Sequence, residues 1–228
     1  MTTTGVHHLA VQTTDMKGQL EFFTQVLGMP LVALFDMHGV PGAIHAFVEL
    51  DPTTGYCLSF TQVPGNEDAE PEVGVTHAGT GAGASAPGTM QHLAFAVADQ
   101  EALLALQDRI RSHGLVVIGP IEHGLCTSIY FGGPEGLVLE AAWSAEPIDA
   151  SRWVDPKICA ELGISDDEAA AMIRPAEFTS EGRVPQPAVD PSKPRLGYPD
   201  EVWAQMATVP DEVLTKSASV TDPPVPAA

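Results

Sequence analysis

The sequence predicts an α+β protein in which two β-α-β-β-β modules pair around a metal site, followed by a largely irregular and helical C-terminal extension. Three observations lead to this prediction. The segment His8-Leu9-Ala10-Val11 recurs as His92-Leu93-Ala94-Phe95, 84 residues later. Each copy is followed by an amphipathic helical pattern and then by three strand-like segments. The second copy ends in Gly136-Leu137-Val138-Leu139-Glu140, which adds one carboxylate to the two repeated histidines.

The first module is predicted over residues 1–63. Its first strand covers about 5–13, and Thr14 or Asp15 then caps a helix that ends at Gly28. The apolar residues of this helix recur at helical spacing, and they are Leu20, Phe22, Phe23, Val26 and Leu27. Three further strands are expected, at 30–36, 43–50 and 56–62.

The second module, over residues 90–144, repeats this plan. A strand at about 90–97 precedes a helix that begins at Asp99 and ends at Gly114. Its apolar residues are Leu103, Leu104, Leu106 and Ile110. The remaining strands are predicted at 115–119, 125–131 and 137–143.

Two other segments lie outside the modules. Residues 64–89 are rich in Gly, Ala, Pro, Glu and Thr, and are expected to form a long inter-module loop of the kind that often has a function. Residues 145–228 are expected to wrap the core as an extension, with disorder over about the last ten residues, 219–228. Short helices are predicted in the extension after Ser165, which begins a capping box, and at 199–207 and 210–217.

Charge and composition exclude several classes of partner. The net charge is −20, and the fixed cations of residues 1–144 are only Lys17, Arg109 and Arg111, against fifteen acidic residues. Such a protein repels nucleic acids and anionic membranes. No apolar run reaches the roughly 18 residues of a membrane-spanning helix, and the N-terminus lacks the pattern of a signal peptide. The three cysteines are too scattered for a disulfide framework, so we expect a cytoplasmic protein.

The repeated histidines are candidate metal ligands. Because side chains alternate across a strand, His8 should face away from Leu9, and His92 away from Leu93. Duplication places equivalent strands side by side, so His8 and His92 are expected to approach one site. His7 faces the other way and is expected to be structural. His38, His45 and His113 belong to no motif and are expected at the surface.

Glu140 is the third candidate ligand. It lies in an apolar strand, where a carboxylate is rarely buried unless it is paired or bound to a metal. The equivalent position of the first module is Ser59, so the predicted site has three protein ligands, His8, His92 and Glu140. A set of two histidines and one carboxylate suits non-haem Fe(II) and leaves coordination positions open.

Residues 5–144 resemble the vicinal oxygen chelate superfamily, which includes glyoxalases, bleomycin-resistance proteins and type I extradiol dioxygenases. That fold pairs two β-α-β-β-β modules whose sheets curve around a metal ion. The segment Ile121-Glu122-His123, followed after five residues by Ile129-Tyr130-Phe131-Gly132-Gly133-Pro134-Glu135-Gly136 and then by Glu140, is similar to the extradiol ring-cleavage motif. The chain departs from the motif at Gly133, where that family usually has Asp. It has a single pair of modules, as the short members do.

This resemblance implies an Fe(II)-dependent extradiol-type dioxygenase that acts on a catechol-like aromatic substrate with O2. It implies catalytic roles for His123 and Tyr130 above the substrate, and for His77 as the acid–base residue. A neutral histidine can take a proton from a catechol, and a tyrosine hydroxyl can donate a hydrogen bond to it.

Two alternatives remain open. One is a glyoxalase- or isomerase-like enzyme that uses Mn, Ni, Co or Zn as a Lewis acid, although glyoxalase I usually has a glutamate where this chain has Ser59. The other is a non-catalytic protein that sequesters a small molecule such as an antibiotic. No nucleic-acid or membrane partner is expected. We expect a homo-oligomer, because Trp153 and Trp203 in the extension are suited to docking on apolar surface, such as that of a partner subunit.

Overall fold

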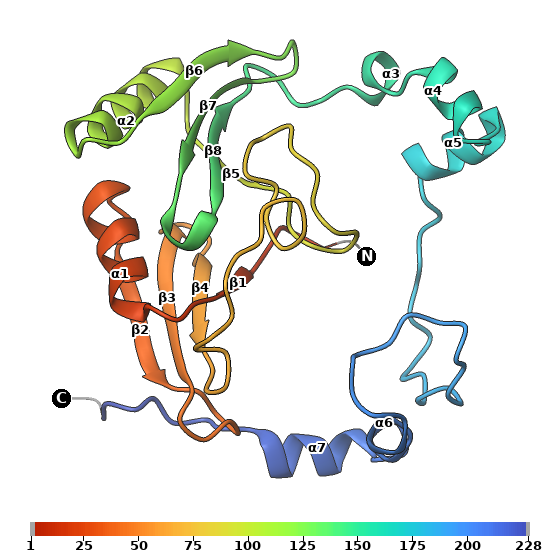
Figure 1. The fold of residues 1–228 in the computed structure, drawn as a ribbon. Helices are drawn as coiled ribbons and strands as arrows, with labels where there is room; N and C mark the ends of the chain where they lie inside the picture. Colours follow the sequence, from red (N-terminus) through yellow and green to blue (C-terminus); the bar gives the residue numbers. More distant parts are fainter. Residues whose placement is uncertain (1–2, 227–228) are drawn as a thin grey trace. The chain divides into compact units, whose positions relative to one another are not determined.

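The computed structural model describes residues 3–226, which divide into two compact units, one of residues 3–175 and one that begins at residue 176. The first unit contains both predicted modules (Figure 1). The elements of module one are β1 (His8–Gln12), α1 (Met16–Glu21), the π-helical turn η1 (Phe22–Val26), β2 (Leu31–Asp36), β3 (Ile44–Asp51) and β4 (Tyr56–Gln62). Those of module two are β5 (Leu93–Ala96), α2 (Gln100–Ser112), β6 (Val117–Glu122), β7 (Thr127–Gly132), the short 3-10 turn η2 (Pro134–Gly136) and β8 (Val138–Trp143).

The two sheets have the same topology. Their strand orders are β1-β4-β3-β2 and β5-β8-β7-β6. In each sheet the first strand of the module runs parallel to the last strand, and the other neighbours are antiparallel. This arrangement confirms the predicted α+β fold with two β-α-β-β-β modules.

Local capping explains where the two helices begin and end. The side chain of Asp15 accepts a hydrogen bond from the amide of Gly18 (2.9 Å), and Asp99 accepts one from the amide of Ala102 (2.8 Å). Gly28 and Gly114 end the helical segments with φ of +80° and +81°, a region in which only glycine is unstrained. The predicted caps and helix ends are therefore confirmed.

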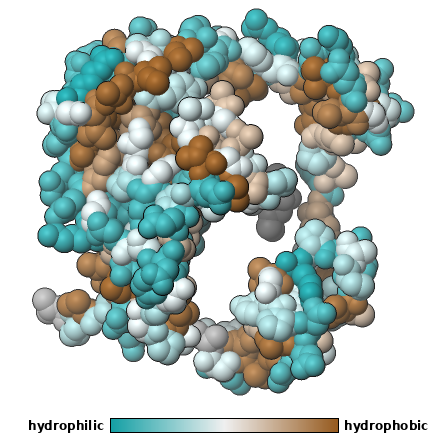
Figure 2. Space-filling view, viewed as in Figure 1, coloured by the Kyte–Doolittle hydropathy of each residue, from teal (hydrophilic) through white to brown (hydrophobic). Residues whose placement is uncertain are grey.

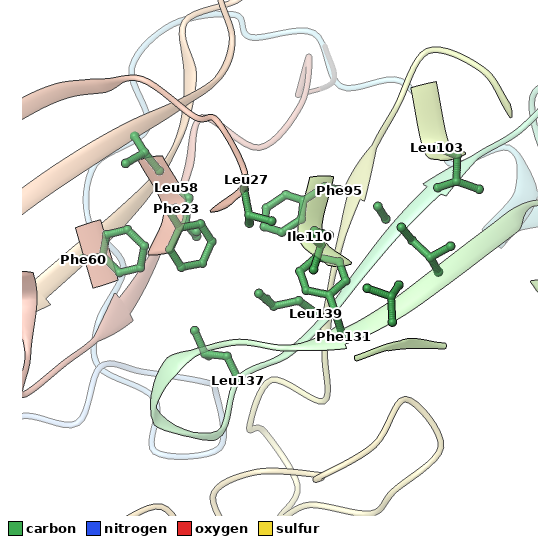
Figure 3. Packing of buried hydrophobic residues seen from close by; sticks show 14 of the residues in the cluster. Phe23, Leu27, Leu58, Phe60, Phe95, Leu103, Ile110, Phe131, Leu137 and Leu139 are labelled. Atoms are coloured by element: carbon green, nitrogen blue, oxygen red, sulfur yellow. The ribbon is translucent and has the colours of Figure 1, made fainter. Parts of the chain in front are cut away.

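The core lies between the helices and one face of each sheet. The ring of Phe23 lies 4.9 Å from that of Phe60 in its own module and 6.3 Å from that of Phe95 in the other module, measured between centroids (Figure 3). Leu139 from β8 is fully buried in the same cluster. Because the cluster contains side chains from both modules, the modules share one core, and each fully buried large side chain contributes about 1.5–3 kcal/mol.

Polar contacts also join the modules, at both ends of the α1–η1 segment. Near its start, the carboxylate of Glu135 accepts hydrogen bonds from the side chains of Thr13 (2.6 Å) and Gln19 (2.8 Å) and from the amide (2.8 Å) and hydroxyl (2.6 Å) of Thr14. At its end, the guanidinium of Arg109 donates to the carbonyls of Gln25 and Val26.

The C-terminal extension is divided between the two units. Residues 145–175 belong to the same unit as the modules and contain α3 (Ala150–Trp153), α4 (Pro156–Glu161) and α5 (Asp166–Ile173), which begins with the predicted capping box at Ser165. The second unit contains α6 (Asp200–Met206) and α7 (Asp211–Ala218), close to the predicted ranges. The wrapping of the core stays a prediction, and residues 227–228 of the predicted disordered end lie outside the described residues. Within residues 3–226, the helices are too short or too polar to cross a bilayer.

Candidate functional site

The strands of both modules turn one face to the core and leave the other face for a site. On β8, Leu139 and Ala141 are buried in the core, so Glu140 between them faces the opposite side of the sheet. On β1, Leu9 and Val11 pack against the core, and the alternate residues His8, Ala10 and Gln12 are exposed. The alternation agrees with the predicted orientation of His8, at the start of β1, away from the core.

The strand registers show which positions of the two modules correspond. Ala10 of β1 pairs with Ser59 of β4, and Ala94 of β5 pairs with Glu140 of β8. Ser59 and Glu140 therefore occupy equivalent positions, as the repeat predicted. On the other side of β8, Glu140 pairs with Tyr130 of β7. Only module two thus has a carboxylate at this position, and it has a phenol beside it.

His92 and Glu140 lie together. The Nε2 atom of His92 is 2.9 Å from Oε2 of Glu140, and the glutamate side chain is only 7% exposed. Two ligands about 2.1 Å from one divalent ion and at right angles to each other would be about 3 Å apart. The type and the spacing of these two donors therefore fit a metal ion.

The hydrogen bond on the other side of the ring strengthens this interpretation. Nδ1 of His92 bonds to Oε1 of Gln91. An amide oxygen only accepts, so Nδ1 carries the proton, and in the neutral ring Nε2 then presents a lone pair to Glu140. Nε2 of His92 and Oε2 of Glu140 therefore face each other as a donor pair that can hold a metal cation.

His8 does not join this pair. Within residues 3–226, no group of three or more His, Cys, Asp or Glu side chains lies close enough to hold one metal ion. The ring of His8 instead contacts His7, at 3.0 Å between the two Nδ1 atoms, and the ring of Phe47, with centroids 5.6 Å apart. The full set of His8, His92 and Glu140 thus stays a prediction, of which the structure brings two members together.

His45 belongs to the same aromatic group as His8, and it is half-buried where a surface position was predicted. Its ring lies 4.4 Å from that of Phe47, and its Nε2 atom is buried without a hydrogen-bond partner among the described residues. Burial lowers the pKa of His45, and the nearby charges of His8 and His38 lower it further. His45 is therefore a weakly basic, half-buried group on the open face of module one.

Tyr130 and His123 form a second polar pair. The phenol oxygen of Tyr130 lies 3.0 Å from Nε2 of His123, and the two rings are nearly perpendicular. Burial raises the pKa of Tyr130, and the negative charge of Glu140 raises it further. The hydroxyl of Tyr130 is therefore protonated at neutral pH and available as a hydrogen-bond donor.

His77 lies in the inter-module loop, beside the turn that precedes β8. Its Nδ1 atom is 2.8 Å from the hydroxyl of Thr76, and its ring lies against Gly136 in the turn before β8. Gly136 is four positions before Glu140, which is about 13 Å of extended chain. The structure thus brings Tyr130 and His123 together with the Glu140 region but gives His77 no contact with it, and the acid–base role of His77 stays a prediction.

An apolar cavity of about 730 Å³ lies on module two, beside the Tyr130–His123 pair. Its polar side chains are those of His123, Tyr130 and Thr80, and none of the lining residues is charged. Val116 and Ile118 on its rim are 82% and 61% exposed, and the apolar band along the top of Figure 2 follows β6. The remaining lining residues come from the inter-module loop and from the segment that runs from β6 to β8. They are Val73, Gly79, Gly81, Ala82, Ile121, Phe131, Gly132, Gly133, Gly136, Leu137 and Val138.

The sequence patterns assigned no contacts to two residues, namely Gln91 at this site and Glu135 between the modules. Gln91 bonds to His92 and to the loop that walls the cavity. Glu135 joins the modules from a left-handed backbone conformation with φ of +52°. Glu135 stands inside the ring-cleavage motif, so an acidic residue between proline and glycine was the available signal. Nothing in the pattern around Gln91 indicates its contacts.

The comparisons with known proteins identify a family. Residues 5–141 match the family model of the Glyoxalase/Bleomycin resistance protein/Dioxygenase superfamily. A glyoxylase/bleomycin resistance protein/dioxygenase domain from Frankia sp. EAN1pec is 16% identical, with a TM-score of 0.49 over 63% of this chain and 99% of its own. An antibiotic binding protein from Streptomyces sp. CB03234 is 20% identical, with a TM-score of 0.43 over 64% and 99%. A fosfomycin resistance protein from Listeria monocytogenes is 16% identical, with a TM-score of 0.42 over 63% and 96%.

A comparison with curated protein sequences finds no match. The assignment therefore rests on the family model, which covers more than half of the chain, and on the topology of the two modules. The superfamily is named for glyoxalases, bleomycin resistance proteins and dioxygenases, so it includes enzymes as well as resistance proteins. The chain belongs to the glyoxalase, bleomycin resistance protein and dioxygenase superfamily, also called the vicinal oxygen chelate superfamily.

Proposed function

We propose that this protein is an Fe(II)-dependent extradiol-type dioxygenase that cleaves the ring of an uncharged, catechol-like aromatic compound. One observation carries the proposal. A large apolar cavity opens beside a hydrogen-bonded tyrosine and histidine, and the tyrosine pairs across the sheet with the glutamate of a His–Glu donor pair. Hydrophobic walls with a few convergent polar groups are typical of small-molecule sites, and the volume is within their usual range of about 300–1,000 Å³.

Three residues would hold the metal. His92 and Glu140 supply two adjacent donors, and His8 is the proposed third ligand. When bound, a ferrous ion supplies a redox-active centre at which an aromatic diol and molecular oxygen can react. A third donor from β1 would also require the open faces of the two modules to approach each other.

The other polar groups act on protons. Tyr130 keeps its proton, because burial and the charge of Glu140 raise its pKa, and it therefore donates to an oxygen of the substrate. His123 lies 3.0 Å from the phenol and can return a proton to Tyr130 or accept one from it. The two side chains form a short relay from the substrate oxygen to the exposed edge of the cavity, where His123 meets solvent.

The lining of the cavity indicates the class of substrate. Because no charged residue lines it, an anionic group such as a phosphonate, phosphate or several carboxylates would enter without a counter-ion. Leu137, Val138 and Phe131 instead offer contact to an apolar ring. The best substrates should therefore be neutral catechols with apolar substituents.

The test is anaerobic loading with Fe(II), followed by measurement of oxygen uptake with a panel of neutral and charged catechols. We expect one O2 consumed for each catechol, a yellow ring-opened product, and an inert Zn²⁺ form, since zinc has no accessible redox change. Activity that persists without oxygen and survives zinc substitution would refute the dioxygenase and favour the Lewis-acid isomerase.

A second candidate is metal-independent binding of an apolar small molecule. It is favoured by one observation, namely that His8 stands apart from the His92–Glu140 pair within the described residues. A protein of this kind would bind hydrophobic aromatics equally well before and after treatment with a chelator, and it would consume no oxygen with any metal. Isothermal titration of the chelated and metal-loaded forms separates the two candidates.

A further inference from the structure

Gln91 connects the wall of the cavity to the ring of His92. Its side-chain nitrogen donates to the carbonyls of Thr80 (3.1 Å) and Gly83 (2.9 Å), and its Oε1 atom bonds to Nδ1 of His92. The two carbonyls accept only, so they fix the orientation of the amide, with the nitrogen toward the loop and the oxygen toward the imidazole. One half-buried amide is thus bonded on both sides.

The loop held by Gln91 forms one wall of the cavity. Residues 79–82 all line it, and the amide of Gly83 closes their turn by donating to the carbonyl of Thr80 (3.0 Å). The turn is tight, because a Cβ atom on Gly83 would lie 2.0 Å from the carbonyl oxygen of Ala78. On its inner side, a Cβ atom on Gly81 would lie 3.0 Å from the ring of Tyr130. Movement of this turn would therefore alter both the cavity and the position of Tyr130.

We infer that Gln91 is a positioning residue that couples metal binding at His92 and Glu140 to ligand binding in the cavity. The inference rests on the proposed function in one respect, namely that His92 binds the metal. A metal ion bound to Nε2 of His92 would fix the plane of the imidazole and, with it, the bond from Nδ1 to Gln91. The amide is then held in the orientation that keeps both bonds to residues 80 and 83, so the wall of the cavity is ordered.

The coupling must act in both directions. If the metal favours the ordered wall, a ligand that packs against residues 79–82 favours metal binding by the same factor. In module one, His7 occupies the position equivalent to Gln91 and contacts His8 through ring nitrogens, 3.0 Å apart. An imidazole whose Nδ1 is engaged has only one ring nitrogen left, so it cannot donate to two carbonyls as the NH2 group of Gln91 does, and the coupling is a property of module two.

The experiment uses the full-length protein, Co²⁺ as a coloured metal probe and N-phenyl-1-naphthylamine as a neutral fluorescent ligand for the cavity. In the parent protein, Co²⁺ should lower the Kd of the fluorophore by about fivefold or more. Gln91→Leu removes all three bonds, so it should weaken Co²⁺ binding about 10–100-fold and abolish the coupling. Gln91→Glu still accepts from Nδ1 of His92 but cannot donate to the loop, so it should keep Co²⁺ affinity and lose the coupling.

Thr89→Ala is the matched control. It removes one hydrogen bond of the same loop, from Oγ1 of Thr89 to the carbonyl of Ala86 (2.7 Å), with no link to His92, so both affinities and their coupling should persist. A parent protein that binds no divalent ion would overturn the proposed function together with the coupling. Normal Co²⁺ binding in the parent, with the same coupling factor in Gln91→Leu or Gln91→Glu, would overturn the coupling alone. The Glu variant decides the question even where the Leu variant fails to fold.

Discussion

The replacement Glu135→Gln should lower the free energy of unfolding, because the Glu135 carboxylate joins the two modules through four hydrogen bonds. Burial of the Glu135 carboxyl raises its pKa, but the bonds from Thr13, Thr14 and Gln19 outweigh this effect and lower the pKa from 4.5 to about 2. A pKa lowered by roughly 2.5 corresponds to about 3 kcal/mol of stabilisation. Because solvent reaches part of the carboxylate, we expect about 1–2 kcal/mol in practice. The NH2 group of the new glutamine would also face the donor groups of Thr13, Thr14 or Gln19, so two donors would oppose each other.

The pH dependence distinguishes this explanation from a general packing effect. A carboxyl with a lowered pKa stabilises the folded state fully above the unfolded pKa of about 4.5, and it loses that contribution as the pH falls toward 2. The difference between parent and variant should therefore be about 1–2 kcal/mol at pH 7, or about 2–8 °C in Tm, and should nearly vanish at pH 2. Urea unfolding at both pH values measures it, with the exposed Glu70→Gln as the neutral control. A difference that does not change with pH would refute the reasoning.

Three further predictions concern the site. His92→Ala and Glu140→Ala should each lose bound metal while keeping the far-UV circular dichroism spectrum of the parent protein. Metal analysis of His8→Ala tests the third ligand. Near-stoichiometric metal in that variant would remove His8 from the ligand set. Tyr130→Phe and His123→Ala should keep the metal but lower kcat about 10²–10⁴-fold, and the double variant should be no worse than the poorer single variant, because both belong to one relay. Gly81→Val should displace the ring of Tyr130, because a Cβ atom added at residue 81 would lie only 3.0 Å from that ring. A shift of about 1 Å can cost about 10²-fold in rate, and unchanged kcat would show that the ring does not act on the substrate.

Much of the fold could be predicted because its signals are local. The caps at Asp15 and Asp99 and the left-handed glycines depend on neighbouring residues alone, and strand alternation shows which side of β8 carries Glu140. The sixth strand was predicted at 115–119, but β6 covers Val117–Glu122 and contains Pro120, which has no amide hydrogen to donate to the sheet. The strand continues to Glu122 through an irregular register between Ile118 and Ile121.

The site was less predictable because it depends on distances between segments far apart in the chain. The repeat placed His8 and His92 on equivalent strands, but it could not determine how closely the open faces of the two modules approach. His77 was assigned from its spacing to His92, and a loop of this length allows many paths at the same spacing. The contact between Gln91 and residues 80 and 83 depends on how that loop folds back, which no periodicity records.

The contacts at the two ends of the α1–η1 segment also affect the order of events during synthesis. Thr13, Thr14, Gln19 and the carbonyls at the end of η1 leave the ribosome well before Arg109 and Glu135, which hold them in the finished protein. The ring of Phe23 likewise cannot contact the ring of Phe95 until the second module has been made. A nascent first module therefore emerges without its contacts to Arg109 and Glu135 and with Phe23 not yet covered by Phe95. It reaches its final form only when the chain has grown past residue 135, so the two halves mature together.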